Sequence, residues 1–306
     1  MNELQIAASD GFLIHAFVLE PKGVPRAHIH LIHGMAEHID RYEEFANYLA
    51  GHGYLVSGHD HRGHGRTVDQ NGKPGHLADA DGFARAVQDS YEVIHSIRVQ
   101  YPAPRFVLFG HSMGSFVARR YIQLHGPEVE LAILSGTGGD PGLGRAAGQL
   151  AAYLSGKKSG FDEPNPFVNK LIFGRYNKNI PAAISPFDWL STDAEAVESY
   201  VNDPKCGIVP TTRFFADLFD GLAVINKANE IAKVPKTLPI LLFSGDADPV
   251  GGYGKGVWET AQQYDDAGVQ DVTVLLFEGK RHEMLHETNR QQVFELVEEW
   301  MRKHEN

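Results

Sequence analysis

The chain has 306 residues, of which 42% are hydrophobic and 22% are charged, and its formal net charge is −11. This length is sufficient for one elaborated α/β domain or two small ones, and the composition is ordinary for a globular protein. The negative charge disfavours nucleic acid and anionic membrane surfaces as partners, because both attract clustered Lys and Arg. A lipid substrate would therefore have to be held by apolar contact.

Two further features of the composition bear on location. No run approaches the roughly 20 apolar residues that cross a bilayer, and the first residues, MNELQIAASDGF, do not resemble a signal peptide. The single cysteine, Cys206, cannot form an internal disulfide and fits a reducing compartment. We therefore expect a cytoplasmic protein with no transmembrane segment. Nothing in the sequence indicates an oligomeric state.

The first part of the chain alternates strand-like and helix-like runs. Strands are predicted at 4–8, 12–19, 27–32, 54–58, 105–110 and 131–135, and helices at 41–50, 81–100 and 113–124. The run RFVLFG at 105–110 is almost wholly apolar, as expected of a parallel strand buried on both faces. This alternation predicts a doubly wound, mostly parallel sheet with right-handed crossovers.

The alternation stops after residue 136. The next convincing buried strand is PILLFSG at 239–245, about a hundred residues later, whereas a βαβ unit needs about 30 residues. We interpret 137–235 as a mainly helical cap inserted into a core domain formed by 1–136 and 236–306. Within the cap, Thr192 and Glu195 are predicted to form a capping box, and TTRFFADLFDGLAVI is predicted to be a helix. A helix at 255–267, a strand at 272–277 and a helix at 289–303 follow.

The pattern G-x-S-x-G occurs at Gly110-His111-Ser112-Met113-Gly114, where a predicted strand ends and a helix begins. This context is that of a nucleophile elbow, in which a sharp turn lifts the serine oxygen above the sheet edge. The helix N-terminus behind Ser112 favours developing negative charge. We therefore predict Ser112 to be a catalytic nucleophile, rather than a residue of an ordinary Gly-rich turn.

A serine nucleophile needs a base and an acid that orients the base, and here they are expected in the chain order Ser, acid, His. The strand 239–245 leads into Asp246 and Asp248, and the strand 272–277 leads towards His282. Asp248 is preferred as the acid because it lies further into its loop, and Asp246 is expected to accept backbone donors of the turn. His282 is preferred as the base over His286, which lies nearer the next element.

An acyl-transfer intermediate also needs an oxyanion hole. The strand 27–32 ends in His33-Gly34-Met35, the position from which one backbone N–H is expected, and the residue after the nucleophile supplies the other. We predict that Met35 and Met113 serve through their main-chain N–H groups. No cofactor and no metal are required by this chemistry.

Several histidines outside this set allow a different reading. The segment His59-Asp60-His61-Arg62-Gly63-His64 could bind zinc, which would make the protein a metallohydrolase. We favour a hydrogen-bonded turn in which Asp60 accepts backbone donors. His28 and His30 share one strand face and are expected to be packed or surface residues. For Glu37 and His38 structural hydrogen bonding is favoured over head-group contact, and Cys206 is either at the pocket border or a buried thiol.

Five stretches together resemble one known family: HGMAEHIDRYEEFANYL (33–49), GHDHRGHGRT (58–67), GHSMG (110–114), SPFDWLSTDAEAVESYVNDPKCG (185–207) and SGDADPV (244–250). They are similar to the monoacylglycerol lipase and bacterial lysophospholipase-like group of serine hydrolases, over nearly the whole chain. The resemblance implies an α/β-hydrolase fold with an inserted cap. In that group the acid lies in a G-x-x-D arrangement, which Gly245 and Asp248 match.

The resemblance also implies a carboxylic-ester hydrolase that acts on a single-chain acyl ester of the monoacylglycerol or lysophospholipid type, through a Ser-Asp-His triad and an acyl-enzyme. Its partner would be a small-molecule or lipid ester, with at most transient membrane contact through the cap. The alternatives are an aminopeptidase or small-ester esterase on the same fold, a metallohydrolase, and a ligand receptor without turnover. Acyl chain length and head group do not follow from the sequence.

Overall fold

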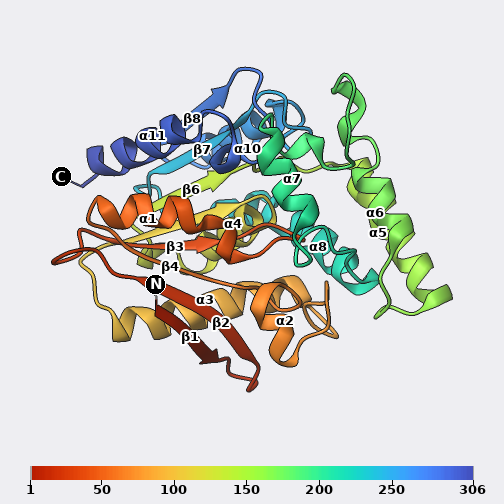
Figure 1. Ribbon diagram of the computed structural model, residues 1–306, viewed down its shortest axis with the longest axis horizontal. Coiled ribbons are helices and arrows are strands. Elements are labelled where there is room, and N and C mark those ends of the chain that lie inside the picture. Colours follow the sequence, from red (N-terminus) through yellow and green to blue (C-terminus); the bar gives the residue numbers. More distant parts are fainter. Residues whose placement is uncertain (1, 306) are drawn as a thin grey trace.

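The computed structural model describes residues 2–305 and is built around one eight-stranded sheet of order β1-β2-β4-β3-β5-β6-β7-β8 (Figure 1). The strands are β1 (Asn2–Ala7), β2 (Leu13–Leu19), β3 (His28–Ile32), β4 (Leu55–His59), β5 (Phe106–His111), β6 (Leu131–Ser135), β7 (Ile240–Gly245) and β8 (Val272–Phe277). β2 pairs antiparallel with β1 and with β4. The six strands from β3 to β8 all run parallel to one another. This is the doubly wound, mostly parallel sheet that the sequence predicted.

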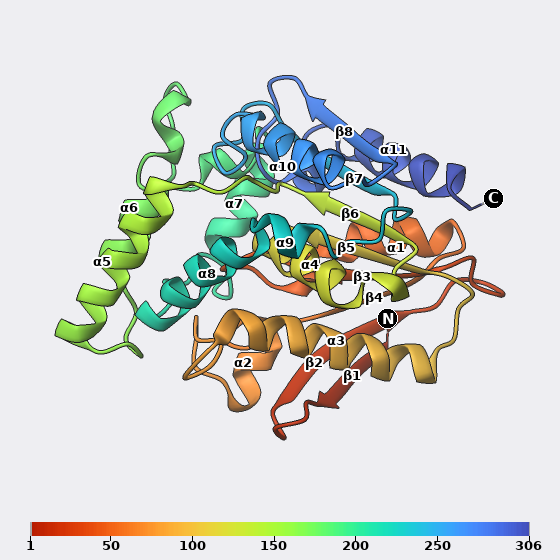
Figure 2. The same ribbon diagram turned by 180° about the vertical axis from the view of Figure 1, so that it is seen from behind.

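Helices cover both faces of the sheet. They are α1 (Glu43–Gly51), α2 (Gly65–Asn71), α3 (Gly82–Gln100), α4 (Met113–His125), α10 (Lys255–Asp266) and α11 (Arg290–Lys303). α1 and α11 lie in front of the sheet in Figure 1, and α3, α4 and α10 lie in front in the reverse view of Figure 2. None of the helices in the described part of the chain is long and apolar enough to cross a bilayer.

Successive side chains of β5 pack alternately against the helices on the two faces of the sheet. Phe106 and Leu108 join the apolar cluster that includes α3, α4 and α10, whereas Val107 and Phe109 join the cluster that includes α1 and α11. Successive side chains of a strand point to opposite faces, so a strand covered on both sides must be apolar throughout. The continuous apolar run of β5 therefore reflects its central place in the sheet.

A helical segment connects β6 to β7. It contains α5 (Leu143–Ser159), α6 (Pro166–Phe173), α7 (Ala194–Asn202), α8 (Thr212–Ile225) and α9 (Ala228–Ile231), with 3-10 turns η3 (Tyr176–Asn179) and η4 (Asp188–Leu190). α5 and α6 are the outermost elements in both views. The buried face of α8, with Phe214, Phe215 and Leu222, joins the same apolar cluster as α3 and α4. The segment is thereby anchored to the helical layer beside the sheet.

One local prediction in this segment is wrong. Helix α7 is capped by Asp193, whose carboxylate accepts the backbone N–H groups of Glu195 and Ala196, and not by a box of Thr192 and Glu195. The Thr192 hydroxyl instead donates to the carboxylate of Glu287, which also accepts the Thr192 backbone N–H at 3.0 Å. The Thr192 hydroxyl, which the local sequence pattern predicted to cap the helix, thus bonds to Glu287, a buried residue distant in the chain.

Candidate active site

Ser112 occupies the turn between β5 and α4. Its backbone has φ 53° and ψ −121°, a conformation that a side-chain-bearing residue adopts only at a cost of order 1–3 kcal/mol. The flanking glycines make the turn possible, because a Cβ on Gly110 would lie 2.3 Å from the Gly114 oxygen and one on Gly114 would lie 2.1 Å from the Ile32 oxygen. Close backbone approach thus holds Ser112 in a strained turn at the carboxyl edge of the sheet, as a nucleophile elbow requires.

Asp248 and His282 meet in the buried space beside this turn. His282 Nδ1 lies 2.9 Å from Asp248 Oδ2, and both side chains are almost inaccessible to solvent. The same carboxylate oxygen accepts the Ser244 hydroxyl at 2.7 Å, and Oδ1 accepts the Val250 N–H at 2.8 Å. The carboxylate is therefore oriented by three partners, and its bond to Nδ1 leaves Nε2 of the imidazole free to act on the pocket side.

The surroundings of His282 set its basicity. Burial disfavours the imidazolium, but the carboxylates of Asp248, Glu283 and Glu37 outweigh this effect and raise the pKa of His282 above its ordinary value. The ring packs against Trp189 of η4 at 5.1 Å between centroids. Gly136 approaches it closely, since a Cβ there would lie 2.9 Å from His282 Cε1. The imidazole is thus held by packing as well as by its hydrogen bond.

Asp246 and His286, the alternatives to Asp248 and His282, lie elsewhere. Asp246 is exposed, and its Oδ1 accepts the N–H of Gly279 at 2.7 Å. The donor belongs to the loop after β8 and not to the turn of Asp246 itself, which corrects that part of the expectation. The ring of His286 lies 6.3 Å from that of Tyr42 and forms no hydrogen bond with Asp248.

The main chain of the loop that holds Met35 approaches Ser112, and Met113 directly follows Ser112. A Cβ on Gly34 would lie 3.2 Å from Ser112 Cβ, so the loop after β3 passes directly beside the serine. Gly34 N donates to Glu37 Oε1 at 2.6 Å, whereas the N–H groups of Met35 and Met113 have no protein acceptor among residues 2–305. Two unsatisfied N–H groups beside a serine are suited to bind a developing oxyanion.

A buried ionic network supports this loop. The structural hydrogen bonding expected of Glu37 is observed, but its partners could not be identified from the sequence. Arg41 Nη1 contacts Glu37 Oε2 at 2.5 Å, and both terminal nitrogens of Arg41 bond to Glu283 at 2.6 Å. Tyr42 donates its hydroxyl to Glu37 Oε1 at 2.9 Å. Arg41 lies in the stretch RYEE and Glu283 directly follows His282, but only the fold brings them together. The network joins the loop of Met35 to the loop of His282.

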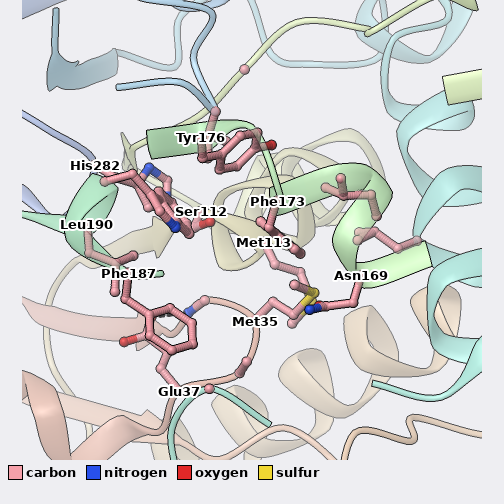
Figure 3. A pocket seen from close by; sticks show the side chains of 18 of the residues that line it. Met35, Glu37, Ser112, Met113, Asn169, Phe173, Tyr176, Phe187, Leu190 and His282 are labelled. Carbon is pink, nitrogen blue, oxygen red and sulfur yellow. Dashed lines mark hydrogen bonds between the residues drawn. The ribbon is translucent and has the colours of Figure 1, made fainter. Parts of the chain in front are cut away.

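A cavity of about 500 Å³ extends from Ser112 into the helical segment between β6 and β7. In Figure 3 Ser112 and His282 lie next to each other at one side of the cavity. The other labelled lining residues around it include Phe187, Tyr176, Phe173 and Met35. Its lining is mainly apolar and includes Met35, Phe116, Ile172, Phe173, Trp189, Leu218, Phe219 and Leu222. Glu37 also borders the cavity, but its carboxylate is already engaged by Arg41, Tyr42 and Gly34.

The histidine-rich segments form hydrogen-bonded core structure. Asp60 accepts the N–H groups of Ile39 and Arg66, each at 2.8 Å, as the turn interpretation predicted. His28 and His30 are both buried and share the Ser57 hydroxyl, at 2.6 and 2.7 Å. Neither of the groups of His, Cys, Asp and Glu that could hold a cation in the described chain includes a residue of His59–His64.

Comparison with known proteins places the chain in a family. Residues 23–289 match the family Hydrolase_4, described as serine aminopeptidase, S33. The chain belongs to this family of α/β-hydrolases, and within it to the monoacylglycerol lipase-like group, as the resemblance of its motifs implied. It is a serine hydrolase of carboxylic esters.

Individual relatives are similar along almost their full length. The chain is 28% identical to a monoacylglycerol lipase of Mycolicibacterium smegmatis, over 99% of this chain and 98% of that protein. It is 28% identical to the Homo sapiens monoglyceride lipase, over 91% of this chain and 82% of that protein. The crystal structure of a thermostable carboxyl esterase from Bacillus coagulans in complex with glycerol superposes with a TM-score of 0.92, at 27% identity and with both chains fully covered.

Proposed function

We propose that Ser112, His282 and Asp248 form a catalytic triad that hydrolyses single-chain acyl esters of the monoacylglycerol or lysophospholipid type. The 2.9 Å contact of His282 Nδ1 with Asp248 supports the assignment of base and acid. His282 Nε2 takes the proton of Ser112 as the hydroxyl attacks the ester carbonyl, and the N–H groups of Met35 and Met113 stabilise the oxyanion. Collapse expels the alcohol, which takes the proton from His282, and leaves an acyl-enzyme. Water activated by the same imidazole then releases the fatty acid.

The substrate class rests on one observation, the apolar cavity of about 500 Å³ that opens at Ser112. We assign residues 137–235 as a cap and 1–136 with 236–306 as the core, because most apolar lining residues, including Phe173, Trp189 and Leu222, come from the segment between β6 and β7. An apolar cavity of this size favours one acyl chain, since each buried methylene contributes about 0.8 kcal/mol. The glycerol bound by the similar Bacillus coagulans esterase and the names of the lipase relatives support a glycerol ester.

A series of monoacylglycerols with increasing chain length, paired with matched diacylglycerols, tests this assignment. We expect kcat/KM to rise with chain length, by at most about fourfold per methylene, until the cavity is filled. Diacylglycerols should react poorly because a cap closed over one chain leaves no space for a second. All substrates must be below their aggregation limits. A maximum at acetyl or propionyl esters would instead identify a small-ester esterase.

An aminopeptidase activity is the second candidate, because the matched family is described by that name. A substrate ammonium would need an unpaired carboxylate in the pocket. The two carboxylates that border the cavity, Glu37 and Glu283, are both bonded to the guanidinium of Arg41. Their pairing disfavours this candidate, and an aminoacyl p-nitroanilide assayed beside the ester series tests it directly.

A further inference from the structure

His38, Asp203 and Cys206 converge at a point that the proposed hydrolysis does not use. One nitrogen, one carboxylate oxygen and one sulfur from these residues all lie within 4.8 Å of one another. His38 belongs to the loop after β3, Asp203 follows α7, and Cys206 lies in the next turn. There the Cys206 N–H donates to the main-chain carbonyl oxygen of Asp203 at 3.0 Å. Nitrogen, oxygen and thiolate ligands together are typical of zinc sites.

The hydrogen bonding of His38 provides a second, independent observation. His38 is 6% exposed, and its Nε2 lies 2.7 Å from Asp203 Oδ2. Its Nδ1 is buried and has no hydrogen-bond partner among residues 2–305, and it lies 3.8 Å from Asp40 Oδ2. A metal-bound imidazole needs an acceptor for its other N–H, and a carboxylate commonly serves. Asp40 can accept from Nδ1 once Nε2 binds the cation, and its Oδ2 also lies 3.0 Å from Arg66 Nη2.

We propose that His38 Nε2, Asp203 and Cys206 bind a divalent cation of the zinc class. On binding, the Cys206 thiol releases its proton to solvent, and the neutral imidazole carries its proton on Nδ1, towards Asp40. The thiolate and the Asp203 carboxylate together balance the charge of the cation. The Asp203 side chain is 29% exposed, so an ion can enter from solvent. Water would complete the tetrahedral coordination that zinc prefers.

The electrostatic surroundings permit a cation here. Arg41 is the cationic group that lies near Cys206, but its guanidinium is bonded to the carboxylates of Glu37 and Glu283. This group of three carries one net negative charge, so it does not repel a cation. Lys205 is directed elsewhere, because its ammonium lies 2.9 Å from Asp69.

The ion would connect two segments that the protein already ties together nearby. The Ala36 oxygen accepts the Tyr200 hydroxyl at 2.8 Å and the Gly207 N–H at 2.9 Å. Both bonds join the loop after β3 to the segment between β6 and β7. A cation at His38, Asp203 and Cys206 would join the same segments without contacting Ser112. Its effect is therefore on stability, because a ligand that binds the folded state raises Tm.

Cobalt(II) is a spectroscopic probe for this site. The full-length protein is treated with a chelator and a non-chelating phosphine reductant and is then titrated with Co²⁺. We expect one equivalent to bind, with a thiolate-to-cobalt charge-transfer absorption that Zn²⁺ abolishes by displacement. Cys206→Ser should remove the absorption, and Asp203→Asn should weaken Co²⁺ binding at least about tenfold, the effect of 1.4 kcal/mol. Asp79→Asn is the matched control, because Asp79 belongs to the other candidate group, with His76 and Asp162.

Thermal unfolding gives a second measurement. Zn²⁺ should raise Tm of the wild-type protein and of Asp79→Asn, and should leave Tm of Cys206→Ser unchanged, while ester hydrolysis by Cys206→Ser without metal stays at the wild-type rate. Absence of the charge-transfer absorption would overturn the proposal. Equal Co²⁺ affinity in Asp203→Asn and the wild type would also overturn it, because the thiol would then bind alone. A Zn²⁺-dependent rise of Tm that persists in Cys206→Ser would place the ion elsewhere.

Discussion

Asp248 and His282 are 34 residues apart in the chain, yet Asp248 Oδ2 and His282 Nδ1 are 2.9 Å apart in the fold. Asp246, only two residues before Asp248, is directed to the backbone of Gly279 instead. Neighbouring parallel strands β7 and β8 end at the same edge of the sheet, so the loops that follow them are adjacent. The position within the loop then decides which carboxylate reaches the imidazole.

Replacing Asp248 should therefore have a much larger effect than replacing Asp246. We expect Asp248→Asn to lower kcat by about 10⁴, because an amide neither holds the required tautomer of His282 nor stabilises its cation. Asp246→Asn is the matched control and should lose far less activity. Steady-state hydrolysis of one p-nitrophenyl ester by both variants measures the difference. The reverse order would make Asp246 the acid.

Ser112→Ala should abolish ester hydrolysis and leave the fold intact. Loss of a triad nucleophile lowers kcat by about 10⁶, and the remaining rate comes from binding and the oxyanion hole. Within residues 2–305 the hydrogen bonds of Ser112 involve only its main chain, so removing the hydroxyl leaves no buried partner unsatisfied there. Circular dichroism checks the fold. Intact-mass spectrometry of the wild type after a fluorophosphonate should show a single adduct, on Ser112. Labelling of a different residue would contradict the proposed mechanism.

In the proposed mechanism His282 is the base and acts only when neutral, so its pKa should set the acidic limb of the activity profile. Burial lowers this pKa, but the surrounding carboxylates outweigh burial and raise it above its ordinary value of 6.5. We expect kcat/KM to fall as the pH decreases through this raised pKa, with a midpoint above 6.5 in the free enzyme. Asp248→Asn should move the midpoint down. A wild-type midpoint below that of free histidine would argue against His282 as the base.

Hydrolysis should not depend on a metal ion. No step of the proposed mechanism uses a cation, so dialysis against a strong chelator should leave kcat/KM unchanged. The cation proposed at His38, Asp203 and Cys206 acts on stability and does not alter this expectation. Loss of activity that zinc restores would move the catalytic centre to the His59–His64 loop or to another metal site, and would support a metallohydrolase.

The buried histidines on β3 and β4, His28 and His59, should make the stability of the fold decrease in acid. Burial lowers the pKa of His28 to about 3 and that of His59 to about 4. Below about pH 6.5 the unfolded chain therefore takes up protons that the folded chain does not, and stability is lost as the pH falls towards these values. At about pH 5 each of these histidines costs about 2 kcal/mol of unfolding free energy relative to pH 8.

Urea unfolding at about pH 8 and about pH 5 measures this loss. A His28→Gln variant, which cannot be protonated, should show a difference between the two pH values that is smaller by about 2 kcal/mol. An unchanged difference would mean that His28 is protonated in the folded protein. Carboxylates also titrate in this range, and the comparison of the two proteins subtracts their contribution.

The order of elements and the position of Ser112 could be determined from the sequence alone. Central parallel strands must be apolar on both faces, so β5 and β7 stand out as continuous runs, and the turn after β5 needs Gly110 and Gly114 because backbone approaches it. The break in the alternation after β6 predicted the helical segment that follows. These are local constraints, and local sequence carries them.

The tertiary structure decided what depends on contacts between distant segments. The network of Glu37, Arg41 and Glu283, the Thr192–Glu287 contact that replaced the predicted capping box, and the meeting of His38 with Asp203 and Cys206 join residues from separate loops. Single side chains carry no local periodicity, and their partners are chosen by the packing of the segment between β6 and β7 onto the core. The strained turn at Ser112 can therefore be predicted from the sequence, whereas the shape of the cavity and the charges around Ser112 arise only on folding.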